Sequence, residues 1–293
     1  MLVSLKELMK DAEEKGYAVG AFNATGIEAL SAIIAAAEQT GHGVILNHAD
    51  VHNFIVPIED IAPLMIERAK KASVPVCVHL DHGQSIESCM KAIRLGFTSV
   101  MLDASGADYE DNVRDTALIC RLAHSVGVSV EAELGHIFVS DNGLGGNQEQ
   151  ESLDSYESAD DVYTNPDMAK DFVERTGVDA LAIAFGTAHG LYKTKPKLDL
   201  DRIKLIKEKI DVPFVMHGGS GLSKEEFQTA IRNGIRKINY YTYMSIAGGN
   251  AVKAAMDKVE EGKDVFFHDI SRIAREAMCE DVKNAIRIFA MDE

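Results

Sequence analysis

Residues 74–105 read VPVCVHLDHGQSIESCMKAIRLGFTSVMLDAS, and they contain an apolar run, a helical stretch and a second apolar run. Residues 74–80 have the β-branched composition of a buried strand, and residues 87–95 carry apolar side chains at helical spacing. Gly96 is placed to end that helix, and residues 98–102 form the second expected strand. The segment therefore predicts a strand–helix–strand unit with polar groups after both strands.

The rest of the chain repeats this layout. The expected strands are residues 17–23, 43–49, 74–80, 98–102, 128–135, 180–186, 213–218 and 237–242. Helical patterns alternate with them at residues 26–39, 58–72, 87–95, 112–125, 166–176, 199–210 and 223–233, after a first helix capped by Ser4. Eight such repeats predict one domain, residues 1–293, folded as an α/β protein of the (β/α)8 TIM barrel type with extra C-terminal helices. A doubly wound open sheet is the alternative.

Composition limits the compartment and the partners. The formal net charge of −16 leaves no basic stripe for a nucleic acid. The chain has neither a signal-peptide core nor an apolar run of ~18 residues, so we expect a cytoplasmic protein without a membrane partner. Four cysteines in apolar settings without close pairing favour buried thiols in a reducing compartment, and these are Cys77, Cys89, Cys120 and Cys279.

Three histidines follow expected strands and each lies next to or near a glycine: His82, His189 and His217. In α/β barrels the C-terminal ends of the strands meet at one rim, where the functional site lies. Three histidines with one open position form a typical catalytic zinc site, whereas separately hydrogen-bonded histidines are the alternative. We expect the other histidines to be structural or loop residues, with His136 as the one weak additional candidate.

Carboxylates and a glycine-rich turn occupy the same expected rim. Asp81, Asp103 and Glu133 could orient a histidine, bind a second metal or transfer protons, and their spacing does not decide among these roles. The turn at residues 217–221 and the segment at 239–242 follow the seventh and eighth strands, where this fold commonly holds phosphate.

Several of these stretches resemble the class II fructose/tagatose-bisphosphate aldolase family, in order, from residue 20 to about residue 245. The matching motifs are GAFN at 20–23, HLDHG at 79–83, SVMLDAS at 99–105, SVEAELG at 129–135, GTAHGLY at 186–192, HGGSG at 217–221 and KIN at 237–239.

The resemblance implies a site residue by residue. It implies a catalytic Zn²⁺ on His82, His189 and His217, an alternative metal position lined by Asp103 and Glu133, and in addition a monovalent cation. Asp81 would donate and accept the proton of the sugar hydroxyl. The implied substrate-binding residues are Asn23, Gly190, Gly218, Gly219, Ser220, Asn239, Tyr240, Tyr241 and Thr242.

The implied activity is that of a zinc-dependent aldolase. It would reversibly cleave a phosphorylated ketose, similar to fructose or tagatose bisphosphate, into dihydroxyacetone phosphate and an aldehyde through a metal-stabilised enediolate. The family also implies a homodimer or homotetramer, with contacts through the helices after residue 245. A zinc- and phosphate-binding paralogue without turnover is the alternative, and a barrel metallohydrolase is a third reading.

The chain departs from the family pattern at three places. Tyr240 and Tyr241 stand where a small or acidic residue is usual, and residues 47–54 lack the usual Ser or Thr. Gln148 falls where the family carries a glutamate base, so we predict Glu149 as the base and Glu151 as the second candidate. We expect the segment 138–165 that carries them to close over the substrate, the alternative being a solvated loop without a catalytic role.

Overall fold

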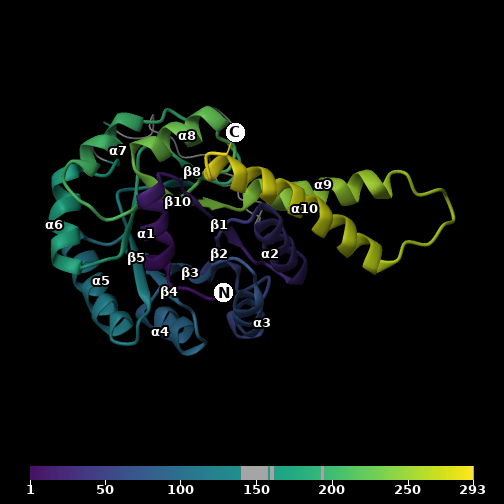
Figure 1. The fold of residues 1–293 in the computed structure, drawn as a ribbon, viewed down its shortest axis with the longest axis horizontal. Coiled ribbons are helices and arrows are strands. Elements are labelled where there is room, and N and C mark those ends of the chain that lie inside the picture. Colours follow the sequence, from purple (N-terminus) through teal and green to yellow (C-terminus); the bar gives the residue numbers. More distant parts are fainter. Residues whose placement is uncertain (140–157, 159–161, 193–194, 293) are drawn as a thin grey trace.

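The computed structural model describes residues 1–139, 158, 162–192 and 195–292, and its centre is a closed barrel of parallel strands (Figure 1). In hydrogen-bonded order the strands are β1 (Val19–Asn23), β10 (Ile235–Tyr240), β9 (Phe214–Met216), β7 (Ala180–Ile183), β5 (Ser129–Leu134), β4 (Ser99–Leu102), β3 (Val76–Gly83) and β2 (Val44–Ala49), which pairs with β1 again. The closure confirms the predicted (β/α)8 barrel and excludes the open sheet.

Helices between the strands form the outer layer. They are α2 (Ile27–Thr40), α3 (Ile58–Lys71), α4 (Ile86–Arg94), α5 (Tyr109–His124), α6 (Pro166–Thr176), α7 (Leu200–Lys207) and α8 (Lys224–Asn233). Helix α1 (Leu5–Lys15) has a different role, because its Leu8 and Met9 pack with the inward-facing Val19, Cys77 and Val215. It therefore closes the N-terminal end of the barrel and leaves the opposite end for the site.

Two further helices project from the barrel as a hairpin, α9 (Thr242–Met256) and α10 (Phe267–Phe289) (Figure 1). Helix α10 packs along both α9 and α2. These are the extra C-terminal helices that the sequence predicts. Among the described residues, no helix combines the length and apolar character needed to span a bilayer.

The structure corrects three boundaries near the site. Strand β3 continues through Gly83, so Asp81 and His82 lie within the strand instead of after it. Thr242 begins helix α9 and does not end a strand. A short parallel pair, β6 (Phe138–Val139) and β8 (Ala188–His189), lies outside the barrel sheet, although the sequence predicts only a polar segment from residue 138.

Candidate active site

Side chains of alternate strand residues point into the barrel. The residues of the candidate site therefore lie directly above a second layer of polar side chains, two residues earlier on the same strands. Asp81 lies two residues beyond His79 on β3, Glu133 two beyond Glu131 on β5, and Asn239 two beyond Lys237 on β10. The deeper members of these pairs are fully buried. The upper members lie at the C-terminal rim, as the fold predicts.

The three histidines predicted as metal ligands meet at this rim. The ring centroid of His82 lies 4.5 Å from that of His217 and 4.9 Å from that of His189. One ring nitrogen from each can be chosen so that all three lie within 4.8 Å of one another. His82 has φ 46°, a left-handed conformation that is uncommon for a residue with a side chain. The strained backbone aims its ring between the other two.

A close backbone contact brings His189 and His217 together. Gly218 has φ 65°, and a Cβ there would lie 2.4 Å from the carbonyl oxygen of Ala188. The Tyr192 hydroxyl spans the same contact, because it donates to the Gly218 carbonyl at 2.7 Å and accepts from the Ala188 N–H at 3.0 Å. Only glycine permits this approach, which places the loop after β9 against strand β8.

The histidine trio fits a divalent metal ion. Nε2 of His189 is buried and has no hydrogen-bond partner among the described residues. Burial and the charges of His82 and His217 lower the pKa of His189 to about 3, so the ring is neutral and its nitrogen is open for coordination. An orphaned imidazole nitrogen beside two other imidazoles matches the donor set that Zn²⁺ and similar ions prefer.

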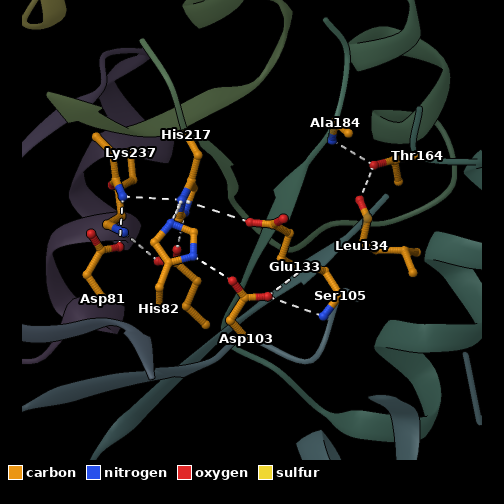
Figure 2. Close-up of polar contacts among 12 residues, drawn as sticks. Asp81, His82, Asp103, Ser105, Glu133, Leu134, Thr164, Ala184, His217 and Lys237 are labelled. Carbon is orange, nitrogen blue, oxygen red and sulfur yellow. Dashed lines mark hydrogen bonds and ion pairs between the residues drawn. The ribbon is translucent and has the colours of Figure 1, made fainter. Parts of the chain in front are cut away.

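A second group of potential ligands shares His82. Asp103 accepts a 2.6 Å hydrogen bond from Nδ1 of His82, and the Ser105 hydroxyl donates to the same carboxylate (Figure 2). Glu133 is buried nearby, where desolvation and the charge of Asp103 raise its pKa to about 8. His82, Asp103 and Glu133 together could also hold an ion, as the family resemblance implies.

Asp81 lies beside the trio and is held by two amides. Asn239 donates to one carboxylate oxygen at 2.9 Å, and Asn23 approaches the other at 3.4 Å. Burial alone would raise the pKa of Asp81, but the charges of His82 and His217 outweigh it and hold the pKa well below its usual range. The carboxylate is therefore ionised and kept in one orientation.

A buried ion pair supports His217 from below, and the sequence analysis does not identify it. Nε2 of His217 lies 2.8 Å from Glu131, whose other oxygen accepts a 2.7 Å bond from Nζ of Lys237. Burial would raise the pKa of Glu131, but Lys237, His79 and His217 lower it to about 2. Because the ionised carboxylate accepts a hydrogen bond from the Nε2–H group, the Nδ1 atom of His217 is left to face the other histidines and lies 2.8 Å from Nε2 of His82. The sequence feature that could have indicated this buried carboxylate is the alternation Glu131-Ala-Glu133 in an otherwise apolar strand.

One cavity of about 540 Å³ joins these groups. Its walls include His82, His189, Asp103, Glu133 and Asp81, whereas His217 is fully buried and does not line the cavity. The walls also include every predicted substrate-binding residue except Gly219, where an added Cβ would meet Ile238 and Phe227. Gln84, His52 and His136 also line the cavity. His52 ends the 3₁₀ turn Asp50–His52, and the sequence analysis does not single it out as a cavity residue. Glu149 and Glu151 lie outside the described residues.

The barrel and its histidine trio thus define an α/β-barrel protein with a candidate divalent-metal site at the strand ends. The model of the family "Fructose-bisphosphate aldolase class-II" matches residues 3–293. The Escherichia coli K12 protein YdjI, whose name calls it uncharacterized, is 38% identical over 294 residues that cover 100% of this chain and 99% of YdjI. A fructose-bisphosphate aldolase of Staphylococcus epidermidis is 38% identical over 98% of this chain and 97% of its own length.

Solved structures that resemble this chain are also named as aldolases. A crystal structure titled as the YdjI aldolase of E. coli K12 superposes with a TM-score of 0.85 at 35% identity, covering 100% of this chain and 98% of that one. A putative fructose-1,6-bisphosphate aldolase from Coccidioides immitis gives a TM-score of 0.81 at 26% identity, covering 97% and 95%. The chain belongs to the class II fructose-bisphosphate aldolase family, whose members are lyases that typically use a divalent metal.

The shared site predicts that no single histidine of the trio is dispensable for metal binding. His189→Ala should lower metal affinity by more than about 100-fold, because even outer-shell changes typically cost 10–100-fold. Elemental analysis after dialysis against a weak chelator measures this directly. His136→Ala is the matched control, since His136 lines the cavity outside the trio. Stoichiometric metal in the His189→Ala protein would refute the shared site.

Proposed function

We propose that this protein is a zinc-dependent aldolase that reversibly cleaves a phosphorylated ketose into dihydroxyacetone phosphate and an aldehyde. The observation that carries the proposal is the orphaned Nε2 of His189 beside two other imidazoles, in the same cavity as an ionised and doubly held Asp81. A metal ligand set and a positioned proton carrier in one cavity are the two parts that such a reaction needs.

The phosphate of dihydroxyacetone phosphate would bind at the N-terminal end of α9. Tyr241 is the N-cap of that helix and makes no side-chain capping bond, so the first-turn N–H groups have no cap. Thr242, Gly218 and Ser220 line the adjoining part of the cavity. Uncapped N–H groups and the helix dipole favour an anion at this position. This device can hold a phosphate despite the net charge of −16.

The chain's own residues would then handle two protons. When bound by His82, His189 and His217, Zn²⁺ supplies a Lewis acid beside the ketone oxygen. In the cleavage direction Asp81 accepts the proton of the hydroxyl whose carbon becomes the aldehyde carbon as the C–C bond breaks. Glu149 returns a proton to the carbon that becomes part of dihydroxyacetone phosphate. In condensation both transfers run in reverse.

Asp81→Ala should keep metal and dihydroxyacetone phosphate binding but lower kcat for cleavage by roughly 100-fold or more, because a positioned proton carrier contributes about that factor. Asp81→Asn is the matched control for shape, since it keeps an oxygen toward Asn239, and it should be similarly slow. Steady-state cleavage and calorimetric binding on the zinc-loaded proteins check both parts. Near-normal turnover of the alanine variant would contradict the role of Asp81.

Glu149→Gln should slow the exchange of the dihydroxyacetone phosphate C–H proton with solvent, because a neutral amide cannot accept that proton. Exchange followed by NMR in deuterated buffer isolates this step from C–C cleavage. Glu151→Gln is the matched comparison and should exchange at nearly the unmodified rate. Unchanged exchange in both variants would place the base elsewhere. No exchange in the unmodified protein would instead favour the binding paralogue, which the presence of Gln148 keeps as the second candidate.

We further propose a homodimer or homotetramer assembled through the α9–α10 hairpin. The hairpin projects away from the barrel (Figure 1), and Phe266 and Phe267 at its turn are 62% and 77% exposed. Large aromatic side chains are enriched in interfaces and costly to leave in water. Light scattering at micromolar concentration should give at least twice the monomer mass. A monomer there would rule out the assembly.

A further inference from the structure

The described walls of the cavity contain carboxylates, and imidazoles are their only side chains that can carry a positive charge. Among the described residues that line it there is neither a lysine nor an arginine, while Asp81, Asp103 and Glu133 all face it. Lys237 is fully buried beneath the rim and is paired with Glu131, so its charge is already neutralised. Outside the described residues, positions 140–157 and 159–161 contain neither lysine nor arginine, and positions 193–194 contain one lysine, Lys193.

Among the described groups, this charge distribution favours one place for a phosphate. The N-terminal end of α9 offers uncapped N–H groups beside Thr242. The wall on the β4 and β5 side carries Asp103, whose carboxylate already accepts a hydrogen bond from His82, and a second phosphate close to Asp103 would meet like charge. Like-charge contacts in a site disfavour a ligand by several kcal/mol. The described cavity is therefore matched to a substrate with a single phosphate.

The wall beyond Asp81, on the side of β1 and β2, is neutral and polar. The Asp81 carboxylate can only accept hydrogen bonds, so the Asn23 group that points toward it is the NH₂ group. The same NH₂ group lies 3.5 Å from Nδ1 of His52. That nitrogen must then accept, and the ring proton resides on Nε2. His52 is 4% exposed, lines the cavity and packs its ring 4.8 Å from that of Tyr241. It offers a neutral N–H donor, which suits a hydroxyl and does not neutralise a phosphate.

The loop that carries His52 is firmly held. Asn53 donates to the backbone and the carboxylate of Asp50, and its own oxygen accepts from the Ile58 N–H at 3.0 Å. The second oxygen of Asp50 accepts from the Gln84 N–H at 3.0 Å. These bonds fix the 3₁₀ turn Asp50–His52, so the position of His52 is built into the loop.

We propose that the substrate is a ketose monophosphate whose aldehyde half is an uncharged polyol, bound by Asn23 and His52, and is not a ketose bisphosphate. This inference rests on the proposed aldolase function and specifies its substrate class. The phosphate stays with the dihydroxyacetone half at α9. The hydroxylated half extends from Asp81 along the neutral wall, away from Asp103 and Glu133.

Matched pairs of ketoses test the proposal on the zinc-loaded full-length protein. Fructose 1-phosphate and tagatose 1-phosphate should each be cleaved with a kcat/KM about tenfold or more above that of the corresponding 1,6-bisphosphate. Calorimetric binding of the same pairs should show the same order of affinity. A preference for either bisphosphate, in turnover or in binding, would overturn the proposal and would leave the aldolase function standing. If the proposed aldolase function is itself wrong, neither member of a pair is cleaved. The relative affinity for the monophosphate and the bisphosphate then decides whether the site prefers a single phosphate.

A charge variant gives an independent test. Val51 lines the mouth of the cavity beside His52 and is 44% exposed, so it can accept a longer side chain. Val51→Arg should reduce the ratio of kcat/KM between monophosphate and bisphosphate by at least about fivefold, because it supplies the missing cation. Val51→Gln, a neutral polar side chain that is shorter than arginine, should leave the ratio unchanged. An equal effect of both variants, or none from arginine, would contradict the charge argument.

Discussion

The buried contact between Glu131 and Lys237 is the interaction on which the candidate site depends. Glu131 binds Lys237 with one oxygen and His217 with the other, and none of the three side chains is exposed to solvent. Removing one partner of such a pair leaves an uncompensated buried charge, typically at a cost of about 3–5 kcal/mol. The pair therefore does more than contribute to stability, because it also fixes which nitrogen of His217 faces the candidate metal site.

The electrostatics of the rim follow from this arrangement. Burial alone would lower the pKa of His82, but the surrounding Asp81, Asp103 and Glu133 raise it to about 10, so the rim without a metal keeps positive charge on that ring (Figure 2). A concentration of carboxylates in a low-dielectric cavity favours a cation at its centre. The same carboxylates make the surrounding walls unfavourable for additional anionic groups. The candidate metal site and the proposed charge of the substrate thus rest on one set of side chains.

Backbone geometry brings the candidate metal ligands together. His82 has a left-handed backbone, and Gly218 lets the loop after β9 touch strand β8. A second contact holds neighbouring strands at the rim, because the Thr164 hydroxyl donates to the Leu134 carbonyl and accepts from the Ala184 N–H (Figure 2). The three histidines come from segments that are far apart in the sequence, and these local contacts hold the segments close together at the rim.

The sequence by itself determined the repeated strand–helix layout, the rim position of the three histidines and the inward carboxylates, because these follow from hydrophobic period and from the geometry of parallel strands. The motifs also identified the family. Only the tertiary structure decided that Lys237 pairs with Glu131 and that His52 reaches the cavity. Both depend on contacts between residues far apart in the chain, where local pattern carries no information. The short β6–β8 pair escaped prediction for the same reason, since two-residue strands are stabilised by the partner segment and not by their own periodicity.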